Sequence, residues 1–229
     1  MYYTKLIIAI AITAALTFSA CGKKDDTTTT QKKDTVTQTK QTTQTSQKMD
    51  TSKPKTDSNV TKKDDEPNTV IMETSMGNIT IELYPEDAPL HVANFKKLVV
   101  SKFYEGTLFH RVISGFMIQG GDPNSKNDDK TMYGQGGPGY TIPAEIKRKH
   151  EKGSLAAARL GDQQNPKRES SGSQFYIVTG EASHLDGQYS VYGKVIKGLD
   201  IADKIQNVKK DERDVPVDKV VIKKVYYAK

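Results

Sequence analysis

One abrupt change in residue usage limits which part of this chain can fold. From Gly22 to Asn68 the sequence consists mainly of threonine, glutamine, lysine and aspartate, with almost no apolar residues. Such a segment cannot bury enough apolar surface to offset the entropy lost on ordering, so we expect it to be disordered. Regular apolar patterning begins at Thr69. The remaining stretch of about 160 residues is long enough for one hydrophobic core, which predicts one domain over residues 69–229.

The N-terminus resembles an export signal. A basic start at Lys5 is followed by an apolar run that is short for a membrane-spanning helix, so residues 1–20 are predicted to be a signal peptide. The residues before Cys21, Phe18-Ser19-Ala20, resemble the lipobox of bacterial lipoproteins, although phenylalanine departs from the usual aliphatic residue. Cys21 is the only cysteine in the chain, which excludes an internal disulfide. We therefore expect lipidation at Cys21, with residues 21–68 acting as a lipid-anchored tether.

The pattern after Thr69 is typical of short antiparallel strands with two helices. A hairpin is expected around Ser75–Asn78, and a helix is expected after Asp87, which can cap it, with Pro89 in its first turn. A second helix is expected over Leu199–Val208. The segments expected to be strands are Phe109–Ile113, Phe116–Gln119, Leu155–Leu160, Gln174–Thr179, Val191–Ile196 and Val217–Tyr227. This order favours a mainly β antiparallel barrel over a doubly wound sheet.

Several motifs that would indicate other chemistry fail in detail. Gly187–Val195 has the wrong glycine spacing for a phosphate loop, and Lys126 stands where a calcium loop needs an oxygen ligand. The histidines have no metal-binding spacing, and no GxSxG motif accompanies Ser173. We therefore expect no cofactor and no metal. The net charge of +6 and pI near 9.1 come from scattered lysines, so we also expect no nucleic-acid partner.

One stretch, FHRVISGFMIQGGDP (Phe109–Pro123), combines a cation, an amide and bulky apolar residues. It resembles the signature of the cyclophilins, a family of peptidyl-prolyl cis-trans isomerases. Shorter matches follow in the family's order, at Ser154–Arg159, Gly172–Ile177, Leu185–Gly187 and Val191–Val195. The resemblance implies a closed eight-stranded antiparallel barrel capped by two helices. It also implies an enzyme that accelerates rotation about the peptide bond before proline.

The resemblance also implies the site residues. Arg111 aligns with the catalytic arginine, which donates a hydrogen bond to the prolyl nitrogen of the twisted amide, and Gln119 aligns with a glutamine that bonds the substrate backbone or orients that arginine. An apolar pocket for the proline ring is implied at Phe116, Met117, Tyr176 and Leu185. The wall that contacts residues ahead of the proline is implied at Ala158, Arg159 and Gln174, and the rim at His184 and Tyr189.

Some positions depart from the family pattern. His184 stands where the members most sensitive to cyclosporin carry tryptophan, which predicts reduced affinity for that drug. Arg159 replaces an asparagine found in some members, and the segment 160–171 looks a few residues longer than the family's compact loop. Two interpretations of this segment remain open: an inert surface loop, which we favour, and a polar extension that lengthens the substrate groove or contacts a partner. We expect His110 to be a structural histidine beside the site, and His91 and His150 to be solvated.

Three functions remain open from the sequence. The first is an isomerase that assists folding of exported, proline-containing polypeptides. The second is a binding module that holds chains in the same groove, and the third is a surface lipoprotein that only shares the fold. Arg111 and Gln119 favour the isomerase, because a pure binder does not need a donor to the twisted amide. We expect a lipid-anchored protein of the cell envelope, and a monomer by default. The chain has Gly22 at the position where some lipoproteins carry the aspartate that retains them at the inner membrane, which favours the outer membrane.

Overall fold

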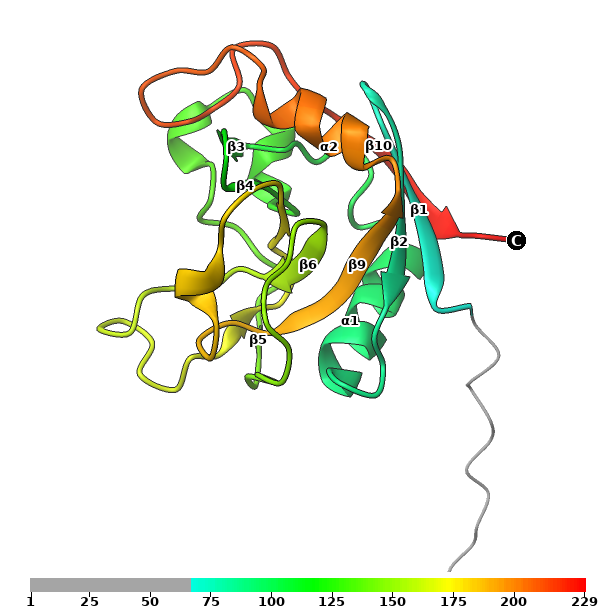
Figure 1. The fold of residues 1–229 in the computed structure, drawn as a ribbon. Helices are drawn as coiled ribbons and strands as arrows, with labels where there is room; N and C mark the ends of the chain where they lie inside the picture. Colours follow the sequence, from blue (N-terminus) through cyan, green and yellow to red (C-terminus); the bar gives the residue numbers. More distant parts are fainter. Residues whose placement is uncertain (1–66) are drawn as a thin grey trace, which may run out of the picture. The chain divides into compact units, whose positions relative to one another are not determined.

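The computed structural model describes residues 67–229, and the predicted signal peptide, Cys21 and most of the tether lie outside them. The described part is mainly β, with two α-helices, α1 (Pro89–Val100) and α2 (Leu199–Gln206). The strands of its main sheet are β1 (Thr69–Thr74), β2 (Gly77–Leu83), β3 (Arg111–Ile113), β4 (Met117–Gly120), β6 (Ser154–Ala157), β8 (Phe175–Val178), β9 (Val191–Lys197) and β10 (Ile222–Tyr227). They form an eight-stranded antiparallel sheet in the order β10-β1-β2-β9-β6-β8-β4-β3 (Figure 1).

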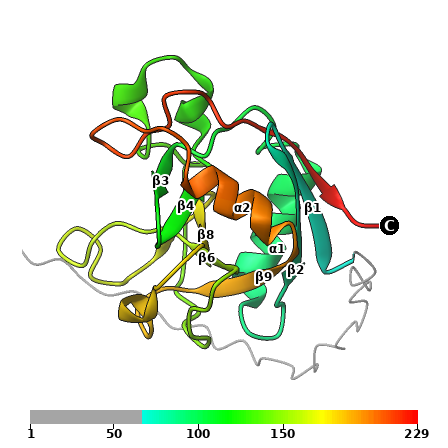
Figure 2. The same ribbon diagram turned by 45° about the horizontal axis from the view of Figure 1, so that its top comes forward.

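The main sheet curls into a half-barrel (Figure 2). Its two edge strands, β3 and β10, are not joined by a ladder in the described residues. Instead, the segment just before β3 meets the start of β10 through an isolated bridge between Leu108 and Val221, flanked by a hydrogen bond from Phe109 N to Val220 O of 2.9 Å. The antiparallel sheet with two helices confirms the coarse prediction, and closure into a complete barrel stays a prediction.

The first helix begins at Pro89, as predicted, but the prediction that Asp87 caps it is wrong. Pro89 occupies the first turn of α1, where the missing amide hydrogen costs nothing because that hydrogen would have no helical partner. Ala88 is the N-cap residue, and no side chain caps the helix. Asp87 pairs with Arg148 instead. The carboxylate of Asp87 is therefore bound in a salt bridge and does not accept a hydrogen bond from the first turn of α1.

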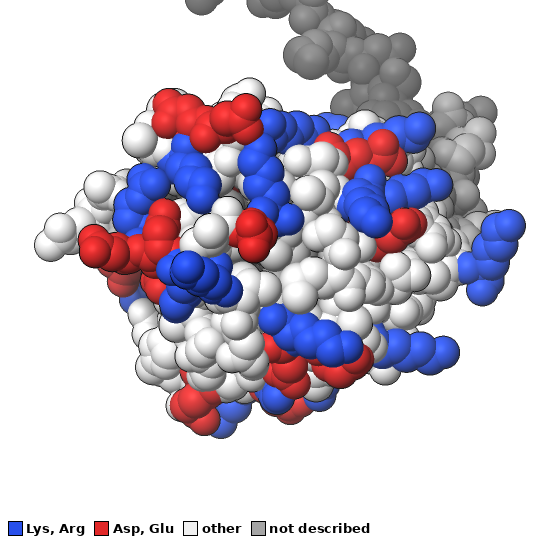
Figure 3. Space-filling view, turned by 90° about the horizontal axis from the view of Figure 1, so that it is seen from above, with Lys and Arg blue, Asp and Glu red and all other residues white. Residues whose placement is uncertain are grey.

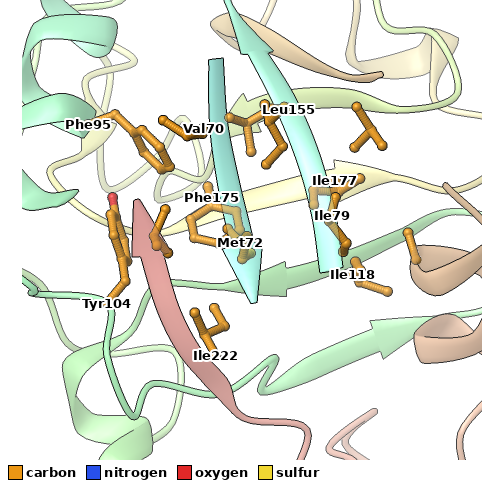
Figure 4. Packing of buried hydrophobic residues seen from close by; sticks show 14 of the residues in the cluster. Val70, Met72, Ile79, Phe95, Tyr104, Ile118, Leu155, Phe175, Ile177 and Ile222 are labelled. Carbon is orange, nitrogen blue, oxygen red and sulfur yellow. The ribbon is translucent and has the colours of Figure 1, made fainter. Parts of the chain in front are cut away.

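The two faces of the half-barrel bury different sets of side chains, because successive residues of a strand point to opposite faces. The inner face carries the main core, in which Phe175 and Ile177 of β8 are fully buried together with Ile118 of β4 (Figure 4). Both α-helices add to this core, for example through Phe95 and Ile205. The main core therefore fills the curl of the sheet.

The outer face of β4, β6 and β8 carries a second, smaller apolar cluster. Its fully or nearly fully buried members include Met117, Ala156, Tyr176 and Val178. These residues alternate along their strands with the members of the main core. The period-two pattern thus places one set of side chains inside the half-barrel and presents the other on its outer surface.

Two short strands lie beside this outer cluster. β5 (Thr141–Ile142) and β7 (Ser170–Ser171) pair as a separate two-stranded sheet. The segment 160–171, expected to be an inert surface loop, is therefore tied at its end to the chain before β6. Within residues 67–229, no helix has the length and apolar character needed to cross a membrane.

Candidate active site: an apolar pocket on the outer face of the sheet

Arg111 and Gln119 lie directly opposite each other in the β3–β4 hairpin. The side chain of Arg111 is 46% exposed, and its Nε lies 4.0 Å from Oδ2 of Asp214. The segment that carries Asp214 is fixed to β3, because Val112 N donates to Asp214 O over 2.8 Å. Such an exposed ion pair contributes little to stability. Asp214 makes its shorter salt bridge to Lys210, over 2.7 Å, so the guanidinium of Arg111 stays largely accessible.

A pocket of about 360 Å³ opens beside this arginine. Met117 and Tyr176 form its floor, and both are nearly fully buried. Phe116 and His184 face each other at one wall, with ring centroids 5.1 Å apart. The lining consists of Arg111, Phe116, Met117, Gln119, Ala158, Arg159, Tyr176, His184, Leu185 and Tyr189. All ten are residues that the sequence predicted for the site.

The eleventh predicted residue, Gln174, lies behind Gln119 and lines an adjoining pocket. Gln119 Nε2 donates to Gln174 Oε1 over 3.0 Å. Gln174 Nε2 in turn donates to the backbone carbonyls of Gly134 and Gly136, over 3.0 and 2.7 Å. Gln174 is 7% exposed. It therefore fixes the amide of Gln119 at the rim and holds a glycine-rich segment against the sheet.

A histidine that was expected to be solvated lies beneath the floor of the pocket. The side chain of His150 is fully buried, and its Nε2 is 2.8 Å from the hydroxyl of Tyr176. Its Nδ1 lies 2.9 Å from Oδ1 of Asp186, which also accepts a hydrogen bond from His150 N. The prediction for His150 was wrong because these partners are distant in sequence. The one sequence feature that could have indicated this contact is the Leu185–Gly187 motif, because it contains Asp186.

Burial and hydrogen bonding set the protonation of Tyr176 and Asp186. Burial raises the pKa of the Tyr176 hydroxyl well above its ordinary value, so the group remains a hydrogen-bond donor. Hydrogen bonds from the backbone N–H and then the ring of His150 lower the pKa of Asp186. Because the Tyr176 hydroxyl is the donor, Nε2 of His150 is its acceptor, and the Nδ1–H of His150 donates to the Asp186 carboxylate. The orientation of the aromatic floor is thus fixed from below.

Arg159 supports the pocket wall and does not project its charge into the pocket. Its side chain is 3% exposed, and its guanidinium carbon lies 4.4 Å from the ring centroid of Tyr189. It donates to the carbonyls of Gln188 and Leu160 and to Oδ1 of Asp162, over 3.0, 2.9 and 2.6 Å. The change from asparagine in some family members therefore ties the segment 160–171 to the rim.

The remaining two buried histidines lie outside the pocket. His91 is 2% exposed, contrary to the prediction, and its Nδ1 is 2.6 Å from Oε2 of Glu145. Burial lowers the pKa of His91, although Glu145 acts to raise it. His110 is 3% exposed, and neither ring nitrogen has a hydrogen-bond partner among the described residues. Its burial agrees with the predicted structural role.

The backbone conformation explains why a glycine stands at Gly121, near the end of the long motif. This residue has a φ of +82°, which only glycine adopts without strain, and an added Cβ would meet the Phe175 ring at 2.9 Å. The chain leaving β4 can therefore pass close to β8.

Among the described residues, no group of three histidine, cysteine or acidic side chains could hold a metal ion.

The comparisons with known proteins agree with this geometry. The family model described as "Cyclophilin type peptidyl-prolyl cis-trans isomerase/CLD" matches residues 69–227. Peptidyl-prolyl cis-trans isomerase B of Bacillus subtilis is 46% identical over 132 residues, which cover 56% of this chain and 83% of that protein. The peptidyl-prolyl cis-trans isomerase of Helicobacter pylori is 41% identical over 140 residues, covering 59% of this chain and 78% of that protein.

Solved structures give the same result. A crystal structure of a cyclophilin type peptidyl-prolyl cis-trans isomerase from Cryptosporidium parvum aligns with a TM-score of 0.63 and 32% identity, covering 71% of this chain and 98% of that one. The same protein, crystallised in the presence of the dipeptide Ala-Pro, aligns with a TM-score of 0.62. On the family match and these relatives, the chain is an isomerase and belongs to the cyclophilin-type peptidyl-prolyl cis-trans isomerases.

Proposed function

We propose that Arg111 accelerates rotation about X-Pro bonds by donating a hydrogen bond to the prolyl nitrogen of the twisted amide. The peptide bond resists rotation by about 18–20 kcal/mol because the nitrogen lone pair is delocalised into the carbonyl. When the bond twists, the nitrogen becomes pyramidal and regains its lone pair, so it can accept a hydrogen bond. The reaction therefore needs no bond to break, only tighter binding of the twisted state than of either planar state.

The pocket supplies the other requirement, which is to hold the proline ring while the preceding residue rotates. Met117 and Tyr176 give an apolar floor, and Arg111 lies at the rim beside Gln119. A fixed donor aimed at a site of developing charge contributes about 3–4 kcal/mol in comparable enzymes. In our proposal Gln119 holds the substrate backbone, and its own amide is fixed by Gln174.

The observation that carries this proposal is the opposition of Arg111 and Gln119 at the edge of a pocket with an apolar floor. A binding module would use the same groove and would not accelerate isomerisation. Refolding of a polypeptide whose slow phase is limited by proline isomerisation separates the two. Wild-type chain should accelerate the slow phase and Arg111→Ala should not. Binding without acceleration by wild-type chain would support the binding module, and equal acceleration by both proteins would exclude the proposed role of Arg111.

The substrates of the proposed reaction are proline-containing polypeptides. On the face shown in Figure 3, lysine and arginine side chains are interspersed with aspartate and glutamate. A mixed surface of this kind gives no single-sign field to attract a polyanion. The proposal therefore assigns recognition to the pocket and its neighbouring groove, and to no charged patch on that face.

We further propose that the enzyme assists folding of exported polypeptides from a lipid anchor at Cys21 in the cell envelope. The support is the sequence of residues 1–68, with its short apolar run, a single cysteine and a long polar spacer. Labelled palmitate should be incorporated into wild-type chain and not into Cys21→Ser. Unlabelled wild-type protein recovered in the soluble fraction of the bacterial host would contradict the anchor.

A further inference from the structure

A second pocket adjoins the proposed proline pocket on the outer face of the sheet. Its volume is about 810 Å³, and it shares Gln119, Ala158 and Arg159 with the smaller pocket. This volume lies within the range of roughly 300–1,000 Å³ that ligand sites in proteins occupy. A polypeptide bound with its proline in the smaller pocket would pass along the shared residues, so side chains near the proline can reach the larger one.

One carboxylate lies in the lining of this second pocket. Glu169 is the only acidic residue in the lining, and Arg159 is the only basic one. The guanidinium of Arg159 is 3% exposed and already bound to Asp162. Two further cations nearby are also engaged, since Arg168 lies 3.1 Å from Asp162 and Lys97 lies over the Tyr140 ring at 5.5 Å.

Glu169 is held in place by its neighbours. Its Oε2 accepts a hydrogen bond from Thr141 Oγ1 over 2.6 Å. Its backbone N–H and carbonyl both bond to the side chain of Asn165, over 3.1 and 2.7 Å. The next residue, Ser170, pairs with Ile142 in the small β5–β7 sheet. The described residues provide no salt-bridge partner for the Glu169 carboxylate, so it remains available to a cation.

The rim of the pocket suits a long side chain with a charged end. Tyr140 is 41% exposed and Leu160 is 61% exposed, and both line the pocket. Lysine and arginine can lay their methylene groups along apolar surface of this kind while the charged group reaches a carboxylate. Glutamate and aspartate in the substrate would be repelled by Glu169, because the one basic residue of the lining, Arg159, is buried and bound to Asp162.

We propose that Glu169 makes the enzyme selective for substrates with a lysine or arginine shortly before the proline, an inference that rests on the proposed function. Charge complementarity discriminates between substrates mainly by excluding the wrong sign, and a fixed carboxylate in a partly enclosed pocket does this better than a freely moving one. The effect is on binding, because the carboxylate lies outside the pocket in which the amide twists.

The test uses the full chain and a peptide series with a neutral Ala-Pro parent. Lysine, glutamine or glutamate is placed in turn at each of the three positions before the proline. NMR exchange gives kcat/KM for each peptide, and titration gives its Kd. For one of the three positions, we expect wild-type protein to prefer lysine over glutamate by about three- to tenfold, mostly in Kd or KM.

Three variants complete the experiment. Glu169→Gln, which keeps an acceptor for Thr141, should abolish the preference, and Glu169→Lys should reverse it. Glu86→Gln removes an exposed carboxylate outside both pockets and should leave the preference unchanged. Absence of a lysine preference at all three positions, or a preference that persists in Glu169→Gln, would overturn the inference.

The inference and the proposed function can fail separately. If the neutral parent peptide is isomerised but charge has no effect, only the role of Glu169 is wrong. If the parent peptide is not isomerised faster with the protein present, the proposed mechanism is wrong, and the Kd values still decide whether Glu169 selects cations.

Discussion

The hydroxyl of Tyr176 lies 2.8 Å from Nε2 of His150, a buried histidine beneath the floor of the proposed proline pocket. The two rings are parallel to within 6°, with centroids 6.0 Å apart. Tyr189 packs edge-on against Tyr176, with an angle of 82° between the ring planes. Tyr176, in the floor of the pocket, is therefore connected through His150 to Asp186.

Removing the Tyr176 hydroxyl should reduce stability much more than activity. Tyr176→Phe keeps the aromatic ring that faces the substrate but leaves Nε2 of His150 buried without a donor. We expect the free energy of unfolding, measured by urea denaturation, to fall by about 1–3 kcal/mol. The value of kcat/KM for a neutral peptide should change by no more than about threefold, because the apolar surface of the pocket is preserved.

Tyr189→Phe is the matched control. The Tyr189 ring also lines the pocket, but the described residues offer its hydroxyl no hydrogen bond. Its loss should change the free energy of unfolding by less than about 0.5 kcal/mol. If both variants are equally stable, the contact between Tyr176 and His150 has no structural role.

His91 should make the folded state sensitive to acid. Burial depresses the pKa of His91 below its ordinary value of 6.5. The unfolded chain therefore binds a proton that the folded chain resists, so stability is constant above about pH 6.5 and falls as the pH drops below it. Glu145 acts in the same direction: burial tends to raise its pKa, but hydrogen bonds from the ring and backbone of His91 and the backbone of Leu90 lower it overall.

The measurement is the free energy of unfolding in urea between pH 4.5 and 7.5. We expect His91→Gln to lose less stability over this range than wild-type protein does. The remaining slope should come partly from His110, whose pKa is also lowered by burial. Identical slopes for wild-type and variant protein would show that His91 does not resist protonation in the folded state.

The local elements of this fold could be predicted from the sequence, but the long-range partners could not. Alternation of apolar residues located the β1–β2 hairpin, short runs rich in apolar residues located the strands β4, β8 and β9, and Pro89 located the start of α1. The environments of His91 and His150 were missed because their partners lie 54 and 36 residues away. No local pattern marks a carboxylate that only the fold brings to an imidazole.

The candidate site likewise divides into a part that local motifs predict and a part that depends on long-range pairing. Its lining was predicted from the family resemblance, because the motifs carry Arg111, Gln119 and Tyr176 in fixed registers. The small β5–β7 sheet was not predicted, since β7 consists of two serines within a polar segment. Serine is not typical of strands, and here the pairing depends on Thr141 and Ile142, which lie close only after the main sheet has folded.

Gln119 should contribute through one hydrogen bond to the substrate. We expect Gln119→Ala to lower kcat/KM by about three- to tenfold, the effect of losing one neutral hydrogen bond. The substitution also removes the hydrogen bond from Gln119 Nε2 to Gln174 Oε1, so the fall in kcat/KM includes the effect of losing that bond. Gln163→Ala, at an exposed position that lines neither pocket, is the control and should retain wild-type kinetics. Kinetics of Gln119→Ala equal to those of the control would exclude a role in substrate binding.

His184 should limit the affinity for cyclosporin. His184 is exposed and packs against Phe116 at the pocket wall. Tryptophan at this position would add stacking surface and an indole N–H donor, so we expect His184→Trp to lower the Kd for cyclosporin by about tenfold. Isothermal titration of both proteins measures the change. Tight binding by wild-type protein, or no gain in the variant, would show that His184 is not the limiting residue.

The most direct test of the proposed mechanism is NMR exchange on an Ala-Pro peptide with wild-type chain, Arg111→Ala and Arg213→Ala. Arg213 is an exposed arginine outside the pocket and serves as the control for loss of charge. We predict fast exchange with wild-type protein and Arg213→Ala, and a fall in kcat/KM of about 10²–10³-fold in Arg111→Ala, with peptide affinity largely retained. Undiminished exchange in a folded Arg111→Ala would contradict the central claim that the Arg111 guanidinium stabilises the twisted amide.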